Sequence, residues 1–335
     1  MARALVAALE YSGHSVDLAS RMQSRDGAGD DAFQRKLVSE AAAMTDKIIA
    51  RGREQSWQVW ITYHSYYKAP DLLGPHVAKA LDIPYVQIEA TRARKRLSGP
   101  WARFARIAED ACDKAALVFY LTQRDAEALA AYAPTAQRQV HLRPFLTYKK
   151  LPARNRGGSG LISVGMFRAG DKVASYELIA QTLSLLKTKE WQLSVVGSGP
   201  AEQTVRRLLA PFEDRIRYLG ALDASGMAAA YDASDILLWP GVNEAFGMVY
   251  LEAQAAGLVA VAQARPGVCD VLAPGVARPA PAAGPAALAR QIDRLLEDTA
   301  LRQSAAQQAR DYIAEHHLIA SAARTLDVSL KELLS

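Results

Sequence analysis

The sequence predicts an α/β protein made of two doubly wound domains, each with a parallel sheet between layers of helices. Short strand-like apolar runs alternate with segments of helical periodicity from end to end, which is the pattern of βαβ units. The runs after residue 160 are continuously apolar, as in strands that are buried on both faces. The 335 residues also exceed one ordinary core and fit two domains of about 150 residues each.

The first half begins with a predicted helix and turn within residues 1–16. Strand-like runs follow at residues 14–20, 58–64, 83–89, 116–122 and 139–144, and helical spacing occurs at residues 35–52, 71–82 and 99–115. A doubly wound domain normally opens with a strand, and an unfilled place in a parallel sheet leaves backbone groups unpaired. We therefore expect that the sequence starts at an internal methionine and that the first strand is missing.

The second half follows a predicted linker at residues 148–160, where Pro, Gly and basic residues occur without periodicity. Buried-type strands are expected at residues 160–167, 191–199, 216–222, 235–241 and 258–264, and helices from residue 285 to the end. We expect two domains, one at residues 1–150 and one at residues 151–310. Residues 311–335 are C-terminal helices that can pack back on the first domain.

The composition is that of a soluble globular protein, with 50% hydrophobic and 22% charged residues. No apolar run approaches the roughly 18 residues that span a bilayer, and no signal-peptide cleavage pattern follows Met1, so we expect a cytoplasmic protein. Cys112 and Cys269 have neither metal-site spacing nor a disulfide framework. Residues 1–156 carry 24 Lys and Arg against 16 Asp and Glu, so the basic excess belongs to the first half.

Residues 91–106, TRARKRLSGPWARFAR, form a basic run with two aromatic side chains. Such a run fits an anionic lipid surface, with peripheral attachment at the inner face of the cytoplasmic membrane. It fits equally an anionic acceptor or a plain solvated face. No recognisable nucleic-acid module is present, and we expect no nucleic-acid partner. His64 ends a predicted strand and is either an acceptor-side residue or a satisfied loop histidine.

Two predicted loops of the second half follow strands. The loop after the strand that ends at Gly165 carries Arg168 and Lys172, which suit a phosphate at the carboxyl edge of a sheet or are two solvated charges. Gly197 ends the next strand and suggests a tight turn with close backbone approach. Glu202 stands where a dinucleotide-binding fingerprint has its third glycine, so we exclude a nicotinamide or flavin cofactor.

The third loop carries Glu244, and a helix is expected from about Ala245 to Gly257. Free backbone N–H groups of Ala245, Phe246, Gly247 and Met248 would then point at an anion. Glu252 lies further along this helix among apolar or small neighbours, where a carboxylate normally has a partner. The alternative is a helix-start carboxylate at Glu244 and an ordinary exposed residue at Glu252.

Residues 233–262, ASDILLWPGVNEAFGMVYLEAQAAGLVAVA, resemble the family 4 retaining glycosyltransferases of the GT-B fold (glycosyl transferases group 1). The hallmark of that family is two Glu residues separated by seven others, with Phe-Gly soon after the first. SVGMFRAGDK at residues 163–172 looks like the family's diphosphate-binding loop, and VVGSGP at residues 195–200 looks like its following turn. The resemblance covers the second half closely and the first half more loosely.

The resemblance implies two Rossmann-like domains that face each other across a cleft, an acceptor-side domain at residues 1–150 and a nucleotide-sugar-binding domain at residues 151–310. It also implies a hexosyltransferase-like enzyme of cell-envelope polysaccharide or glycan biosynthesis. Such an enzyme moves a sugar from a nucleotide-diphosphate donor to an acceptor hydroxyl, with retention at the anomeric carbon and without a metal or other cofactor. The acceptor would be a glycan, a lipid-linked molecule or a small molecule. The absence of any Asp-x-Asp sequence agrees with metal independence.

The same resemblance implies roles for individual residues. Glu244 would bind hydroxyls of the donor sugar, and Glu252 would hold the ribose hydroxyls. The Gly165 and Gly197 turns, with Arg168 and Lys172, would surround the departing diphosphate, where negative charge develops.

We expect that the family's first Gly-rich loop is missing together with the first strand. The sequence also departs from the family pattern at three residues. Met166 stands where an Arg is common, so Arg168 and Lys172 fit only with one inserted residue. Glu89 stands where many members have a catalytic-site His, and Asp270 where many have Glu. We assign Glu89 a catalytic role beside Glu244. Alternatives are a nucleotide-sugar epimerase on the same fold and an inactive nucleotide-sugar-binding fragment.

Overall fold

The computed structural model describes residues 1–153 and 160–335. The described residues form two compact units. Unit 1 contains Met1–Arg143 and Ala322–Ser335, and unit 2 contains Pro144–Ser321. Residues 154–159, inside the predicted linker, lie outside the described residues.

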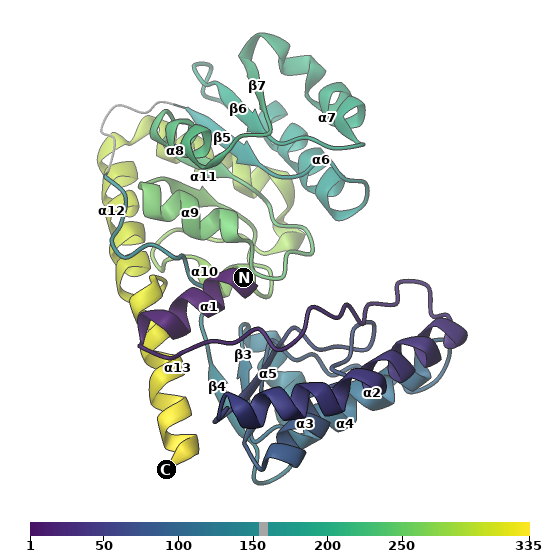
Figure 1. Cartoon of the computed structure of the whole chain (residues 1–335). Helices are drawn as coiled ribbons and strands as arrows, with labels where there is room; N and C mark the ends of the chain where they lie inside the picture. The colour runs from purple at the N-terminus through teal and green to yellow at the C-terminus, as the bar shows by residue number, and fades with distance from the viewer. Residues whose placement is uncertain (154–159) are drawn as a thin grey trace. The chain divides into compact units, whose positions relative to one another are not determined.

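Unit 1 is built on a four-stranded sheet in which all neighbours are parallel, in the order β1-β2-β3-β4. The strands are β1 Trp60–Tyr63, β2 Tyr85–Ile88, β3 Leu117–Tyr120 and β4 Arg138–His141. Its helices are α1 Ala2–Tyr11, α2 Asp31–Glu54, α3 Gly74–Leu81, η1 Arg94–Arg96, α4 Ala102–Lys114, α5 Gln123–Ala130 and most of α13 Ile319–Leu334 (Figure 1). Four of the five predicted strands are therefore confirmed.

The predicted strand at residues 14–20 is wrong, because residues 12–30 contain neither helix nor strand. Polar side chains tie this segment to helices instead of to a sheet. His14 Nε2 lies 3.2 Å from Asp327 Oδ1 of α13, and Asp17 pairs with Arg51 of α2. Ser12 Oγ donates to the carbonyl oxygen of Ala323 at 3.0 Å, also in α13. The last helix thus packs against the N-terminal segment of unit 1.

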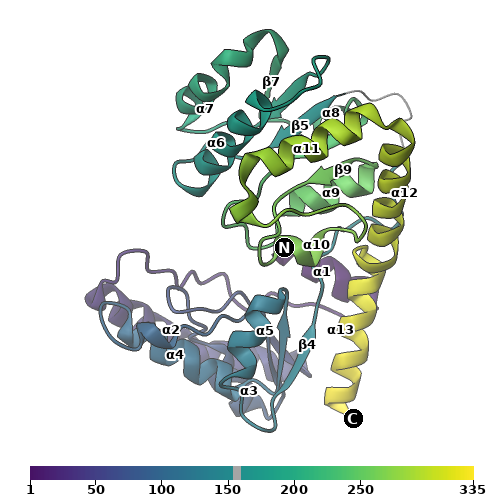
Figure 2. The same ribbon diagram turned by 180° about the vertical axis from the view of Figure 1, so that it is seen from behind.

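Unit 2 has a five-stranded parallel sheet in the order β7-β6-β5-β8-β9. The strands are β5 Leu161–Val164, β6 Leu193–Val196, β7 Ile216–Gly220, β8 Ile236–Leu238 and β9 Val259–Val261, each within a predicted range. The helices are α6 Asp171–Ser184, α7 Glu202–Leu209, η2 Ala210–Arg215, α8 Ala224–Asp232, α9 Met248–Ala256, α10 Val268–Val271, η3 Pro281–Ala283, α11 Gly284–Glu297 and α12 Thr299–His316. Helix α12 packs beside α9 (Figure 2).

The strand order of unit 2 places a topological switch point between β5 and β8. From β5 the chain moves outward through β6 to β7, and it then returns to the other side of β5 with β8 and β9. Because the two βα loops at such a point run in opposite directions, a crevice opens outside the carboxyl ends of the two strands, where ligands bind in open α/β sheets. These are the loops that carry Lys172 and Glu244.

Candidate functional site

Lys172 and Glu244 meet at this switch point. Lys172 lies in the first turn of α6, which follows β5, and its Nζ forms an ion pair with Glu244 Oε1 in the loop after β8. The indole Nε1–H of Trp239 donates to the same oxygen at 3.0 Å. The two charged side chains are only 16% and 14% exposed. The carboxylate is thus held by two donors at a place where little water competes.

The loop after β8 is fixed to the start of α6 by two further hydrogen bonds. Asn243 Nδ2 donates to Asp171 Oδ2 at 2.9 Å, and the backbone N–H of Val242 donates to Ser175 Oγ at 3.1 Å. Asn243 has φ 51°, a left-handed conformation that asparagine tolerates better than most residues. These bonds set the position of the Glu244 backbone before any ligand binds.

Trp239 is fully buried and depends on the glycine that ends β5. A Cβ built on Gly165 would lie 2.4 Å from the indole of Trp239, and one built on Gly197 would lie 2.0 Å from the carbonyl oxygen of Gly165. The close backbone approach predicted at Gly197 is therefore an approach to the neighbouring loop. Tyr250 OH donates to the Trp239 carbonyl oxygen at 2.9 Å and holds the backbone at the end of β8.

Helix α9 begins three residues later than predicted, at Met248. Gly247 has φ 73° and stands just before the helix, so it ends the loop instead of continuing a helix from Ala245. The carbonyl of Ala245 is packed against Gly267, where a Cβ would lie 1.7 Å from its oxygen. The helix N-terminus therefore lies at Met248, and Ala245 and Phe246 belong to the preceding loop.

Glu252 has the partner that its apolar surroundings predict. Tyr231 OH, from α8, donates to Glu252 Oε2 at 3.2 Å. Burial raises the pKa of Glu252 above its ordinary value, and the hydrogen bond from Tyr231 opposes that rise only in part. The other predicted cation, Arg168, is exposed and forms no ion pair with another described residue. Arg168 is thus available to an anionic ligand beside the Lys172–Glu244 pair.

Unit 1 has a second polar cluster at the carboxyl ends of β1 and β2. His64 follows β1 and Glu89 follows β2, with His64 Nδ1 3.4 Å from Glu89 Oε2. Both have φ near 60°, 63° and 59° respectively, and strained backbone of this kind occurs often at functional sites. The hydrogen bond with Glu89, with the charges of Glu89 and Asp125, raises the pKa of His64 despite partial burial. Burial and Glu89 also raise the pKa of Tyr63.

The partner residues of these sites were not found from the sequence. Trp239, Tyr231 and Tyr63 read as core or strand residues, since nothing in their spacing links them to Glu244, Glu252 or Glu89. Only for Trp239 could a partner have been predicted from the sequence. Its indole stands directly before Pro240 at a strand end and needs a hydrogen-bond acceptor once it is buried.

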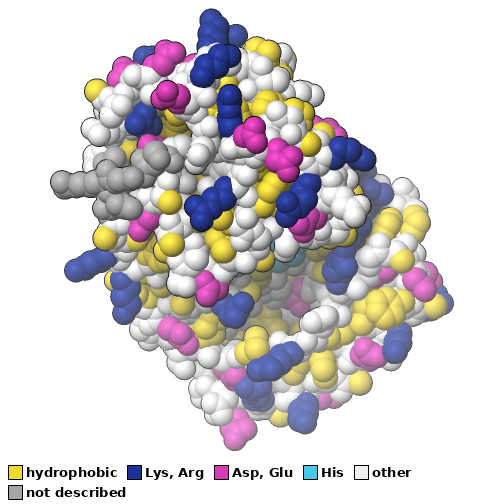
Figure 3. Space-filling model, turned by 90° about the horizontal axis from the view of Figure 1, so that it is seen from above, with side chains coloured by type: hydrophobic (Ala, Val, Ile, Leu, Met, Phe, Trp, Pro, Cys, Tyr) yellow, Lys and Arg dark blue, Asp and Glu magenta, His cyan; other side chains and the backbone are white. Residues whose placement is uncertain are grey.

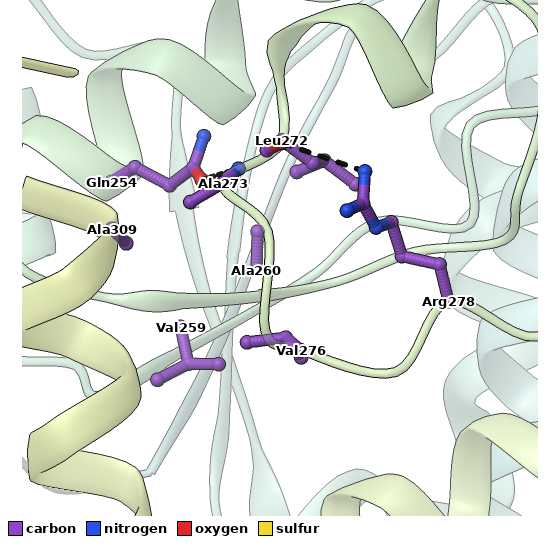
Figure 4. A pocket seen from close by; sticks show the side chains of 8 residues that line it. All are labelled: Gln254, Val259, Ala260, Leu272, Ala273, Val276, Arg278 and Ala309. Carbon is purple, nitrogen blue, oxygen red and sulfur yellow. Dashed lines mark hydrogen bonds between the residues drawn. The ribbon is translucent and has the colours of Figure 1, made fainter. Parts of the chain in front are cut away.

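A cavity beside β9 is not part of the site (Figure 4). Gln254 crosses it, accepting from Ala273 N–H at 2.8 Å and donating to the carbonyl oxygens of Tyr250 and Val271. Its volume of about 10 Å³ holds no more than one water molecule. Gln254 therefore joins α9 to the segment after α10 as a structural residue.

Among the described residues, no helix is both long and apolar enough to cross a bilayer. Within the same residues, no group of three or more His, Cys, Asp and Glu side chains is placed to hold a metal ion.

Residues 158–298 match the family described as Glycosyl transferases group 1. The chain is 27% identical over 278 residues to a 2-deoxystreptamine glucosyltransferase of Streptomyces kanamyceticus, covering 73% of this chain and 71% of the relative. It is 32% identical over 179 residues to a phosphatidyl-myo-inositol mannosyltransferase of Mycobacterium leprae, which covers 53% of this chain and 48% of that relative.

Solved structures agree with the fold. A glycosyltransferase from Rickettsia africae superposes with a TM-score of 0.72 at 16% identity, over 99% of this chain and 94% of the other. Anabaena HepE in complex with UDP gives a TM-score of 0.66 at 17% identity, over 89% and 82%. The predicted fold class is confirmed. Residues 158–298 are therefore similar to the glycosyl transferases group 1 family, and the α/β fold has GT-B glycosyltransferases as solved neighbours.

Proposed function

We propose that this protein is a glycosyltransferase that moves a sugar from a nucleotide-diphosphate donor to an acceptor hydroxyl. The observation that carries the proposal is the Lys172–Glu244 ion pair at the switch point of unit 2. A glucosyltransferase and a mannosyltransferase among the relatives, and a neighbour with bound UDP, support it.

The donor would lie along the carboxyl ends of β5, β6 and β8. Glu244 accepts hydrogen bonds from hydroxyls of the donor sugar, and Glu252, further along α9, accepts them from the ribose. Arg168 and Lys172 face the diphosphate, with Gly247 and Met248 N–H at the start of α9. Fixed cations and backbone donors stabilise the charge that grows on the leaving diphosphate in the transition state. Lys172 would then bridge the phosphate and Glu244.

Retention at the anomeric carbon and independence of metal ions are part of the proposal, and both rest on the resemblance to family 4. In unit 1, Glu89 lies beside His64 and would accept a hydrogen bond from a hydroxyl of the acceptor. A role in glycan or cell-envelope synthesis fits the mannosyltransferase relatives.

The test is incubation with a panel of UDP- and GDP-sugars, with and without acceptor mixtures, followed by NMR of the products. The proposal expects a new glycoside with the anomeric configuration of the donor, formed equally in the presence of EDTA. A changed sugar in the absence of acceptor would identify an epimerase. Binding of a donor with neither transfer nor hydrolysis would identify a binding protein. Either result would overturn the proposal.

A further inference from the structure

Two cations share two aromatic rings at the carboxyl edge of the unit 1 sheet. Lys68 follows β1, and its Nζ lies 4.9 Å from the ring centroid of Trp101 and 5.8 Å from that of Tyr67. Arg96 ends η1, after β2, and its Cζ lies 5.6 Å and 5.2 Å from the same two centroids. Cation–π attraction explains how each cation is held. It does not offset the repulsion between two like charges that lie near the same two rings.

No carboxylate neutralises this pair among the residues that the structure describes. The Asp26 carboxylate is nearby in the chain fold, but it accepts from the N–H groups of Ala28 and Gly29 and from Gln34 Nε2. Over the face shown in Figure 3, Lys and Arg side chains are mixed with Asp and Glu. Neither Lys68 nor Arg96 thus has an acidic partner among the described residues.

In the basic run at residues 91–106, some charged side chains form ion pairs within unit 1 and others do not. Arg92 is buried and pairs with Glu109 at 2.7 Å and Asp113 at 2.6 Å. Arg103 pairs with Asp31 at 2.9 Å. Arg96, in contrast, has a buried Nε with no hydrogen-bond partner among the described residues. A buried donor without an acceptor is costly, and an anion is the acceptor that a guanidinium prefers.

The two rings are held in place before any ligand binds. Trp101 Nε1 donates to the carbonyl oxygen of Asp26 at 3.2 Å. The ring centroids of Trp101 and Tyr67 are 5.8 Å apart, those of Tyr67 and Tyr66 5.6 Å, and those of Tyr66 and His64 5.0 Å. A continuous row of rings therefore leads from the Lys68–Arg96 pair to His64, which contacts Glu89.

We propose that Lys68 and Arg96 bind a phosphate group carried by the acceptor, while the acceptor hydroxyl lies at Glu89. The identification of the ligand as a sugar acceptor rests on the proposed function. The binding of phosphate by Lys68 and Arg96 does not. A phosphomonoester or phosphodiester presents several oxygens, which can accept from the Lys68 ammonium and the Arg96 guanidinium. The row of rings sets the spacing between the phosphate and the hydroxyl that receives the sugar.

The binding test follows the indole N–H signal of Trp101 by NMR, identified by its absence in Trp101→Phe, during titration with inorganic phosphate. K68Q/R96Q should weaken phosphate binding roughly tenfold or more, because it removes two charge-assisted contacts. K68R/R96K should restore most of the affinity. The matched control is K47Q/R53Q, which removes two exposed charges from α2 in the same unit and should bind phosphate as the wild type does. Equal phosphate affinity in all four proteins would overturn the inference.

Two further arms separate the sources of the phosphate. The same titration is repeated with sn-glycerol 3-phosphate, and sedimentation is measured with vesicles of phosphatidylglycerol in phosphatidylcholine. A loss specific to K68Q/R96Q with the soluble ester supports a soluble phosphorylated acceptor, and one seen only with vesicles supports a lipid-linked acceptor. If neither loss occurs, the inference is wrong.

Turnover distinguishes this failure from failure of the proposed function. Sugar transfer to glycerol 3-phosphate should exceed transfer to glycerol in the wild type and in K47Q/R53Q, and K68Q/R96Q should lose that preference. If all three proteins transfer sugar with the same acceptor preference, the phosphate site is wrong and the proposed glycosyltransferase function still stands. If K68Q/R96Q alone loses phosphate binding and no donor gives sugar transfer, the phosphate site is supported and the proposed function is wrong.

Discussion

Lys172 and Glu244 lie 72 residues apart in the chain and form an ion pair that is largely withdrawn from water. The pair joins the two loops on either side of the switch point of unit 2, and Trp239 adds its N–H to the same carboxylate oxygen. If either charge is removed, the other stays in a site with little solvent, which is costly. The relationship therefore bears on both stability and donor binding.

Coupling between the two residues is the first prediction. Lys172→Gln and Glu244→Gln should each lower the free energy of unfolding by about 1–3 kcal/mol. The double variant should lose clearly less than the sum, because no unpaired charge remains. Urea unfolding of the wild type, the two single variants and the double variant measures this double-mutant cycle. Strictly additive losses would show that the two side chains do not interact.

The second prediction concerns the pH dependence of stability at Glu252. Its folded-state pKa is raised by burial, so ionisation opposes folding. Stability from this group is fully present below the unfolded-state pKa and is lost as the pH rises through the folded-state pKa. Glu252→Gln should therefore be more stable than the wild type at neutral pH, with the advantage disappearing in acid.

The same Glu252→Gln variant should bind nucleotide-sugar donors roughly tenfold more weakly, since it loses a charged acceptor for hydroxyls. Thermal unfolding across pH and donor titration check the two effects. Glu190→Gln, at an exposed position of unit 2, is the matched control and should change neither. A destabilised Glu252→Gln at neutral pH would contradict the assignment.

Gly165→Ala tests whether the packing of Trp239 positions Glu244. The added methyl would lie 2.4 Å from the buried indole, so the indole or the strand end must shift. We expect a loss of about 1–3 kcal/mol in unfolding free energy together with weaker donor binding. Gly27→Ala adds the same methyl group where the nearest atom is 3.6 Å away on a flexible arginine. If Gly165→Ala binds the donor as tightly as the wild type does, the packing of Trp239 does not position Glu244 for donor binding.

His64 and Glu89 predict a shifted titration in unit 1. The pKa of His64 is raised above 6.5, first by the hydrogen bond with Glu89. The stabilisation is complete below the unfolded-state value and is lost as the pH rises through the folded-state value. Glu89→Gln should lower the pKa of His64, measured by NMR, although the Asp125 charge remains. Glu127→Gln, exposed on α5, should leave the titration as in the wild type, and equal pKa values in all three proteins would exclude the pair.

The sequence predicted the strands of unit 2 because each is a continuous apolar run between turn residues. It failed at residues 14–20, where alternation looked like a strand. That alternation reflects contacts of His14 and Asp17 with helices that are distant in sequence. It also placed the start of α9 at Ala245, since the apolar run hides the positive φ of Gly247.

For the candidate site, spacing and resemblance singled out Glu244, Glu252, Arg168 and Lys172. They did not predict that Lys172 pairs with Glu244, because that contact depends on the sheet order. Arg96 and Trp101 belong to the basic run at residues 91–106, but the place of Lys68 beside them could not be predicted, since the shared rings come from two loops that only the fold brings together.

The most direct test of the central claim compares release of nucleoside diphosphate by the wild type, Glu244→Gln and Glu177→Gln, using a panel of UDP- and GDP-sugars with acceptor mixtures. Glu177 is exposed on α6, the helix of Lys172, and its variant should keep the wild-type rate. Glu244→Gln should keep the fold and lower kcat/KM by roughly 100-fold or more, because it removes the charge that holds the donor sugar and Lys172. Release by Glu244→Gln at the wild-type rate, or no release from any donor by the wild type, would contradict the claim.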